Sequence, residues 1–396
     1  MRIGNTIYLD HQATTPLDSR VFSEMSPYID QRFGNPHSGD HALGWQAAQA
    51  VEAASRRVAR LIGADSDEII FTSGATESNN LALLGLARRA AAGSRRRVLV
   101  GALEHKCVLE IGRVLGARLG FNVEQVPVDE DGRVVTQSLE DMIDDDVLFV
   151  SIMAVNNEIG TIEDIESIRD IIRGSGAVFH CDAAQAPCAL DISTFAEHVD
   201  LLSLSAHKIY GPKGVGALFV RRELQGQIEP LFYGGGQQNG LRSGTVPTPL
   251  CVGMGAAAEL LGNDEALAER EAVARLRDTF VEELNRLPWA IRLNGPELGP
   301  QRHPGNANVC FEGFAAHDIL GSLQPRLSAS TGSACATGMP EPSHVLRGIG
   351  LSDQEAEASI RFSLGRQTTE QDVVEAVQMI GEALDNLAAS GVARTG

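Results

Sequence analysis

The sequence predicts an α/β protein in two parts: a large unit built on a mostly parallel sheet, and a smaller C-terminal α+β unit. Between about residues 46 and 220, short apolar runs alternate with amphipathic helical stretches. Such alternation is typical of a parallel sheet that helices cover on both faces. A glycine-rich segment follows at 233–245, and three further strand-like runs after residue 290 predict the second unit.

The elements of the large unit follow from hydrophobic periodicity and turn residues. Apolar positions three or four residues apart predict helices, and short β-branched runs predict buried strands. The predicted helices are 46–63, 79–91, 108–120 and 165–176. The predicted strands are 68–74, 96–103, 147–155, 177–185, 200–208 and 215–220.

The C-terminal unit follows a long charged helical region over roughly 251–287, which is expected to join the two units as one long helix. Its strands are predicted at 291–295, 306–313 and 359–365, and a helix from about 370 to 388 closes the chain.

Composition favours a globular protein that binds neither nucleic acid nor a membrane. The chain has 396 residues, 43% of them hydrophobic, and a net charge of −19. A surface this negative repels phosphate backbones, so direct nucleic-acid binding is disfavoured. No apolar run approaches the ~20 residues of a membrane-spanning helix. The first residues also lack the charged start and apolar run of a signal peptide.

The six cysteines indicate a reducing compartment, because they are scattered and no two have the C-x-x-C spacing. We therefore predict a cytoplasmic protein with no metal site. Five cysteines in or beside apolar runs are expected to act as small hydrophobic residues: Cys107, Cys181, Cys188, Cys251 and Cys310. The sixth, Cys335, differs because it lies among small residues in "STGSACATGMPEP" (330–342), which predicts an exposed loop.

Polar residues end two of the predicted strands. Lys208 ends one strand, and Asp182 ends another with Gln185 one turn later. Ligands of parallel α/β sheets bind beyond the carboxyl ends of the strands. Each residue alone has a plainer structural interpretation, as a surface lysine or a turn cap. Together they suggest pyridoxal phosphate (PLP), which needs a Schiff-base lysine and an anionic partner for its ring nitrogen.

Two further segments fit the same cofactor. Gly74, Ala75 and Thr76 lie between a strand and a helix start, where backbone N–H groups favour a phosphate. Ser205 and His207 would add donors from a neighbouring strand end. His105 follows the strand 96–103, and an imidazole there can stack on a flat ring and transfer protons near neutral pH.

These segments, taken in order, resemble the cysteine desulfurases, which are PLP enzymes of fold type I. The resemblance rests on "YLDHQATTPLD", "GNPHS", "FTSGATESNN", "EHK", "NNEIG", "CDAAQ", "SAHKIYGPKG", "RSGT", "STGSAC" and "SIRFSLGR", and it covers about residues 7–372. It implies a large PLP-binding domain with a mostly parallel seven-stranded sheet over 16–262. A discontinuous small domain, 1–15 with 263–396, would carry the cysteine loop.

The resemblance also implies roles for single residues. Lys208 would hold PLP covalently, Asp182 would pair with the pyridinium nitrogen, Gln185 would lie near the phenolic oxygen, and His105 would stack on the ring. The phosphate would be bound by Ala75, Thr76, Ser205 and His207, with Thr245 reaching it from the second subunit of a homodimer. The substrate carboxylate would be held by Asn35, Asn156 and Arg361.

The implied activity is removal of sulfur from L-cysteine to give L-alanine. Lys208 would move the α-proton, and the Cys335 thiolate would attack the substrate sulfur and keep it as a persulfide. Thiolate formation requires a lowered pKa or a base such as His105. The segment between Cys335 and Arg361 resembles the long-loop branch of the family, in which the persulfide passes to acceptor proteins. Such acceptors serve iron–sulfur cluster assembly, tRNA thiolation or DNA phosphorothioation.

Two alternatives remain open at this stage. A selenocysteine lyase would share nearly all of the cofactor residues, and a degenerate scaffold could bind sulfur-relay partners without turnover. The last residues, "NLAASGVARTG", lack the tryptophan-bearing tail by which relatives dock an iron–sulfur scaffold, which puts that partner in doubt.

Overall fold

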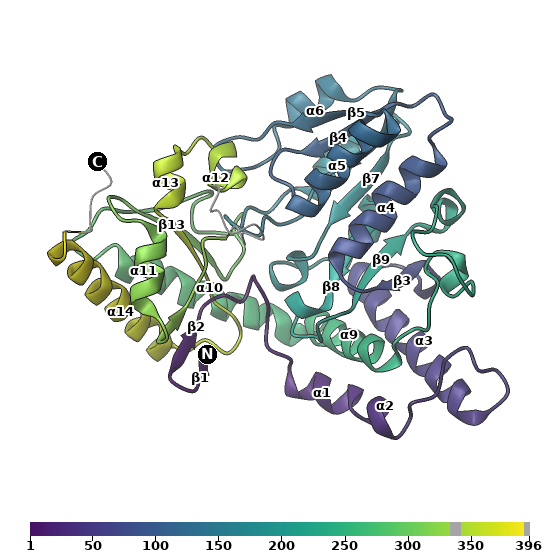
Figure 1. Ribbon diagram of the computed structural model, residues 1–396, viewed down its shortest axis with the longest axis horizontal. Coiled ribbons are helices and arrows are strands. Elements are labelled where there is room, and N and C mark those ends of the chain that lie inside the picture. The colour runs from purple at the N-terminus through teal and green to yellow at the C-terminus, as the bar shows by residue number, and fades with distance from the viewer. Residues whose placement is uncertain (333–341, 392–396) are drawn as a thin grey trace.

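The computed structural model describes residues 1–332 and 342–391. Two groups of elements lie side by side in it (Figure 1), one around a large sheet and one around the C-terminal strands. Cys335 lies outside the described residues.

The large sheet has seven strands in the order β3-β9-β8-β7-β6-β4-β5. Their bounds are β3 Ile69–Thr72, β4 Arg97–Gly101, β5 Asn122–Val126, β6 Val147–Ser151, β7 Val178–Asp182, β8 Leu201–Ser205 and β9 Gly216–Val220. All neighbours are parallel except β9, which runs antiparallel to both β8 and β3. The predicted mostly parallel seven-stranded sheet is therefore confirmed.

Helices cover both faces of this sheet, as the alternating sequence pattern predicts. One apolar cluster joins the sheet to α3 (Ala42–Ile62), α7 (Ile165–Ile172) and α9 (Thr248–Leu261). A second cluster joins the other face to α4 (Ala75–Arg89) and α5 (Lys106–Leu119). The shorter helices of this part are α1 Ser19–Met25, α2 Pro27–Asp30, α6 Thr136–Met142 and α8 Phe195–His198.

The C-terminal elements form an apolar cluster of their own, separate from the two clusters of the large sheet. Strands β10 (Ile291–Leu293), β11 (Asn306–Phe311) and β13 (Ser359–Ser363) make an antiparallel sheet. Helices α10 (Asp264–Leu284), α11 (Ala316–Leu323) and α14 (Glu370–Ala389) pack against it. The short helices α12 (His344–Gly348) and α13 (Asp353–Glu357) lie between Pro342 and β13.

The first residues of the chain contribute to the apolar cluster of the C-terminal elements. Strands β1 (Arg2–Ile3), β2 (Thr6–Tyr8) and β12 (Leu327–Ser328) form a small sheet in which β2 pairs in parallel with β12. The side chains of Ile7 and Leu9 are buried in the same cluster as β11 and β13. The domain boundaries drawn from the sequence stay a prediction.

The predicted single helix over 251–287 is wrong, because the chain forms two helices there. Helix α9 ends at Leu261 and α10 begins at Asp264. Asn263 lies between them in an extended conformation, and its side chain accepts a hydrogen bond from the backbone N–H of Ala266. An asparagine N-cap starts a new helix, so the charged run is divided at this point. No helix in the described part of the chain is long and apolar enough to cross a membrane.

Arg302 ties the loop after β6 to the C-terminal elements. Its side chain is only 1% exposed and has no carboxylate partner among the described residues. Instead it donates to the carbonyl oxygens of Ile159, Asn294 and Pro296 and to the side-chain oxygen of Asn306. Ile159 follows two residues that line the cavity described below.

We expect Arg302→Ala to destabilise the fold by about 3 kcal/mol or more, because four buried acceptors lose a charged donor. Urea denaturation followed by circular dichroism measures this loss. Arg275→Ala is the matched control, since the Arg275 side chain is 71% exposed and its nearest carboxylate is 3.9 Å away. Equal midpoints for the two variants would contradict the prediction.

Candidate active site

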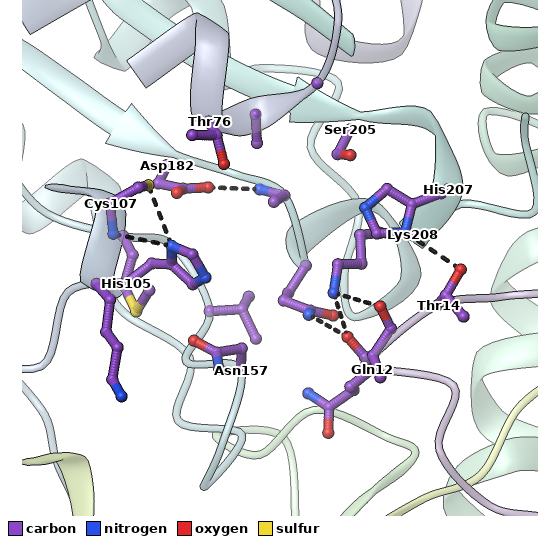
Figure 2. Close-up of a pocket in the computed structure, with 18 of the residues that line it drawn as sticks. Gln12, Thr14, Thr76, His105, Cys107, Asn157, Asp182, Ser205, His207 and Lys208 are labelled. Atoms are coloured by element: carbon purple, nitrogen blue, oxygen red, sulfur yellow. Dashed lines mark hydrogen bonds between the residues drawn. The ribbon is translucent and has the colours of Figure 1, made fainter. Parts of the chain in front are cut away.

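A cavity of about 740 Å³ opens at the carboxyl ends of the central strands. Residues that follow β3, β4, β6, β7 and β8 line it, together with the segment after β2 and residues of the C-terminal part. Nine of the predicted site residues line it: Ala75, Thr76, His105, Asp182, Gln185, Ser205, His207, Lys208 and Arg361. Figure 2 labels six of them: Thr76, His105, Asp182, Ser205, His207 and Lys208.

Lys208 extends into the cavity from the turn after β8. Its Nζ donates to the carbonyl oxygens of Gln12 at 2.5 Å and Ala13 at 2.9 Å. Burial, with Arg361 nearby, lowers the pKa of this amine to about 8, although Asp10 and Asp182 favour the charged form. A larger share of neutral amine at pH 7–8 makes Lys208 a better nucleophile and base than an exposed lysine.

Asp182, the last residue of β7, is held by two donors. The side-chain nitrogen of Asn79 donates to Oδ2 at 2.7 Å, and the backbone N–H of Ala184 donates to Oδ1 at 3.0 Å. The carboxylate is 5% exposed and still borders the cavity. Gln185 is fixed by a bond from its side-chain nitrogen to the carbonyl oxygen of Gln12. These bonds orient both side chains.

The turn between β3 and α4 forms an anion-binding end of the cavity. Gly74 precedes α4 with φ of 151°, which favours glycine, and no side chain caps this helix start. The N–H groups of the first turn therefore face the cavity without a side-chain acceptor. A Cβ at Gly216 of β9 would lie 2.6 Å from the Gly74 Cα, so this close approach also requires glycine.

Ser205 and His207 border the same end from the neighbouring strand. Burial, with Lys208 and Lys213 nearby, lowers the pKa of His207 to about 4. The ring is therefore neutral near pH 7, and its Nδ1 lies 3.2 Å from the Thr14 hydroxyl. The residues predicted to bind a phosphate are thus brought together.

His105 begins α5 as its N-cap. Its Nδ1 accepts from the backbone N–H of Cys107 at 3.2 Å, and the Cys107 sulfur lies 3.1 Å from the same nitrogen. Burial lowers the pKa of His105, and the Lys208 charge acts in the same direction. Cys107 packs against the apolar cluster of α4 and α5, as expected, and in addition it contacts a predicted catalytic residue and lines the cavity.

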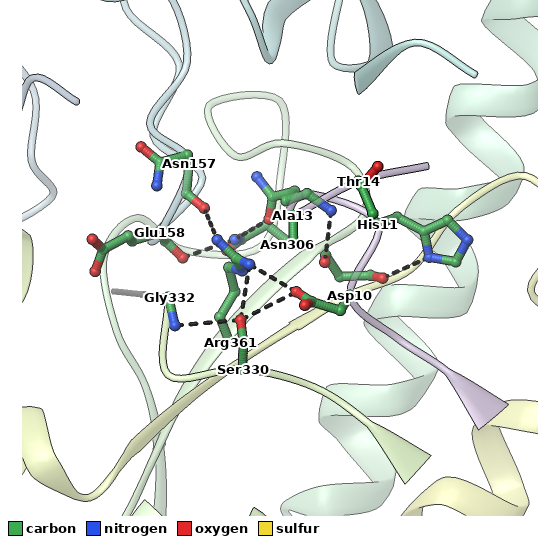
Figure 3. A network of polar contacts seen from close by, with 12 residues as sticks. Asp10, His11, Ala13, Thr14, Asn157, Glu158, Asn306, Ser330, Gly332 and Arg361 are labelled. Atoms are coloured by element: carbon green, nitrogen blue, oxygen red, sulfur yellow. Dashed lines mark hydrogen bonds and ion pairs between the residues drawn. The ribbon is translucent and has the colours of Figure 1, made fainter. Parts of the chain in front are cut away.

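Arg361, in β13, reaches the cavity from the C-terminal sheet (Figure 3). It is 4% exposed and forms an ion pair with Asp10 at 2.7 Å. It also donates to the Asn157 carbonyl oxygen and the Ser330 hydroxyl. Its buried Nε has no hydrogen-bond partner among the described residues. A cation with an unused donor at this place can bind a substrate carboxylate.

Asn156 requires a correction by one residue. Its Oδ1 accepts from the backbone N–H groups of Glu158 and Ile159, and its Nδ2 donates to the Leu103 carbonyl oxygen. The side chain is used to hold the turn and does not line the cavity. Asn157 lines the cavity in its place (Figure 2).

Two other predicted residues lie outside the cavity of this chain. Asn35 is exposed, and its side chain accepts from the backbone N–H of His37. Thr245 is also exposed and does not line the cavity. The position of Cys335 is outside the described residues, but Gly332 and His344, near the two ends of that segment, both line the cavity.

Several residues that shape the cavity are not evident from the sequence. Gln12 and Ala13 act through backbone oxygens, which no side-chain motif reveals. Glu158 accepts from the Ser343 hydroxyl at 2.5 Å, and His344 Nε2 lies 3.0 Å from the Glu104 carbonyl oxygen. The motifs "NNEIG" and "EHK" pointed to these segments without resolving which side chain faces inward.

The chain has only three lysines, and all of them line this cavity: Lys106, Lys208 and Lys213. Of these three, only the side-chain amine of Lys208 donates hydrogen bonds to other described residues. Lys106 and Lys213 are exposed at the cavity wall. The cavity is thus the one place where amines gather on a chain of net charge −19.

Comparison with known proteins identifies the family. The model of the aminotransferase class-V family matches residues 7–376. The chain belongs to the class-V aminotransferase family. This family member is 45% identical over 381 residues to cysteine desulfurase IscS of Rickettsia akari (strain Hartford), an alignment that covers 96% of this chain and 92% of the relative. The resemblance to the cysteine desulfurases is therefore confirmed.

Similar solved structures agree with this assignment. A NifS-like protein superposes with a TM-score of 0.89 at 35% identity, covering 96% of this chain and 100% of the other. A structure titled SspA in complex with cysteine has a TM-score of 0.79 at 36% identity, covering 92% and 100%.

PLP is the cofactor of this class-V family, and the residues present fit it. Lys208 supplies an amine of lowered pKa, and Asp182 supplies a fixed carboxylate for a pyridinium nitrogen. The uncapped start of α4 supplies N–H donors for a phosphate. This donor set matches a flat cationic ring with a phosphate arm.

Proposed function

We propose that the chain removes the sulfur of L-cysteine, releases L-alanine and keeps the sulfur as a persulfide on Cys335. The observation that carries the proposal is a single cavity that holds Lys208, Asp182, His105 and Arg361. Gly332 and His344, which flank the segment with Cys335, border the same cavity. When bound, PLP supplies the electron sink that stabilises negative charge at the substrate α-carbon.

The residues of the chain then act as follows. Arg361 binds the substrate carboxylate, and Lys208 Nζ takes the proton from the α-carbon. The Cys335 thiolate attacks the substrate sulfur, so a sulfur–sulfur bond forms while the carbon–sulfur bond breaks. The electron pair of that bond stays with the three-carbon product, which takes up protons to become L-alanine. Asp182, whose carboxylate is held by Asn79 and Ala184, would pair with the ring nitrogen of PLP.

The N–H groups of Ala75 and Thr76, together with Ser205 and His207, would hold the phosphate of PLP, and Gln185 would lie near its phenolic oxygen. We further propose that Thr245 completes this site from the second subunit of a homodimer, because it is exposed and outside its own cavity. Exposed apolar residues on α1, α2, the loop after α2 and the start of α3 support such an interface: Phe22, Ile29, Phe33, Leu43 and Trp45.

We propose a cytoplasmic enzyme whose acceptors are proteins, which serve iron–sulfur cluster assembly, tRNA thiolation or DNA phosphorothioation. The acidic surface disfavours direct contact with nucleic acid. We also propose the domains as 16–262, and 1–15 with 263–396, because the apolar cluster of the C-terminal elements is separate from the two clusters on the faces of the large sheet.

A product assay tests the activity. The purified holoenzyme is mixed with L-cysteine, without reductant, and alanine and the intact protein mass are measured after one turnover. We expect one alanine per active site and a mass increase of one sulfur atom that maps to the peptide with Cys335. Alanine without protein-bound sulfur would refute the persulfide, and no alanine would refute the activity.

The lowered pKa of Lys208 predicts how reconstitution depends on pH. The neutral amine is the reactive form, so the rate at which the apoenzyme binds PLP covalently should rise with a midpoint near pH 8. An unperturbed lysine would give a midpoint near ~10.4. Stopped-flow absorbance between pH 6.5 and 10 measures the rate. A midpoint above about 10 would contradict the role given to burial.

Arg361→Lys is expected to raise KM for L-cysteine by roughly 10- to 100-fold, because a lysine cannot form the paired bonds of a guanidinium. We expect kcat to change much less, since the side chain does not transfer protons. Steady-state kinetics measure both constants. Arg113→Lys, on the exposed surface of α5, is the control. An unchanged KM would show that Arg361 does not bind the carboxylate of the substrate.

A further inference from the structure

Cys107 is the one cavity-lining thiol among the described residues, and the proposed mechanism does not use it. It lies in the first turn of α5, with its sulfur 3.1 Å from His105 Nδ1. Its own backbone N–H also donates to that nitrogen. The thiol and the backbone N–H of Cys107 therefore both contact Nδ1 of the His105 ring.

Asn79 determines the direction of these bonds. Its side-chain nitrogen donates one hydrogen to Asp182 Oδ2 at 2.7 Å and lies 3.2 Å from the Cys107 sulfur. An amide nitrogen carries two hydrogens and accepts none, so the sulfur receives the second one. With this donor directed at the sulfur, its own S–H is left for His105.

The thiol keeps its proton under working conditions. Burial, with Asp182 nearby, raises the pKa of Cys107 to about 12. The sulfur is therefore an S–H donor near pH 7, and the bonds run in one direction, from Asn79 to Cys107 and from Cys107 to His105. Figure 2 shows the two contacts between Cys107 and His105 on one edge of the ring, while the opposite edge points into the cavity.

We propose that Cys107, held by Asn79, is a positioning residue that fixes the tautomer of His105, so that the ring presents an Nε2–H to the cavity. A nitrogen that accepts hydrogen bonds carries no proton in the neutral ring, so the proton lies on Nε2. His105 then donates a proton or a hydrogen bond to a group in the cavity. It does not remove the Cys335 proton, in contrast to the expectation drawn from the sequence.

The catalytic consequence rests on the proposed function, whereas the tautomer itself does not. We therefore test the tautomer without substrate. The holoenzyme is labelled with 15N-histidine, and His105 is assigned by comparison with His105→Gln. We expect a protonated Nε2 and an unprotonated Nδ1 in the wild type. A protonated Nδ1 in the neutral ring would overturn the proposal, whatever the activity toward L-cysteine.

Two variants distinguish the effect of the Cys107 thiol from that of its backbone N–H, because the backbone hydrogen bond to His105 remains in both. Cys107→Ala removes the S–H donor, so the pKa of His105 should rise by about half to one pH unit in an NMR titration. Cys107→Ser restores a donor and should return the pKa toward the wild-type value. Asp182, Lys208, Glu158 and His344 also face the ring, and they are the same in both variants.

Two further outcomes would overturn the proposal. An unchanged pKa of His105 in Cys107→Ala would show that the backbone N–H alone determines the tautomer of the ring. An equal rise in both variants would show a packing effect of the sulfur. If instead the NMR results agree but no alanine is formed from L-cysteine, the tautomer stands and the proposed function fails.

Discussion

Lys208→Ala is expected to reduce alanine formation from L-cysteine by roughly 10³-fold or more, because the variant loses both proton transfer and covalent attachment of the cofactor. Lys208 suits both tasks because its amine lies in the cavity, with a pKa of about 8 and two backbone oxygens as partners. Steady-state alanine release measures the loss.

The other two lysines are the natural comparison for this variant. Lys106 and Lys213 line the same cavity, so they test whether any nearby amine can substitute. After borohydride reduction, peptide mapping should place the cofactor on Lys208 in Lys106→Ala and in Lys213→Ala. Covalent cofactor on another lysine in the wild type, or full activity of Lys208→Ala, would reject the assignment.

Cys335→Ala should reduce alanine formation to background, because no other thiol of suitable reactivity reaches the substrate sulfur. Cys107 lines the cavity, but burial raises its pKa to about 12, so it cannot supply a thiolate near pH 7. The variant should still bind PLP and respond spectroscopically to L-cysteine, since Lys208, Asp182 and Arg361 are intact.

Cys310→Ala serves as the control, because Cys310 is a buried residue of β11 outside the cavity. We expect it to retain activity. Full activity of Cys335→Ala would instead favour an enzyme that releases sulfur directly, as a selenocysteine lyase does with selenium.

The sheet was predictable where its strands are buried. Strands β4, β6 and β8 are rich in Val and Leu and almost entirely buried, and each lies within a predicted range. Strand β5 was missed because it lies at the sheet edge, where Glu124 and Gln125 replace the apolar pattern. The division between α9 and α10 was missed because the helical periodicity continues on both sides of Asn263.

The site was predictable in its residue types but not in every side-chain direction. Asp182 and Lys208 follow strands of one sheet, so topology alone brings them together. The choice between Asn156 and Asn157 depends on the turn, in which the first amide is used to bind backbone groups. Cys107 lies in an amphipathic stretch, and periodicity does not show that its sulfur faces His105.

The distribution of lysines gives this chain an unusual chemical handle. Apart from the N-terminal amine, which is paired with Asp372, every primary amine of the protein lies at the cavity. Reagents that acylate or alkylate amines would therefore report on this one place, with little background from the rest of the surface. A fluorescent ester, or a lysine-directed inhibitor, would be expected to distinguish occupied from empty sites in the intact protein.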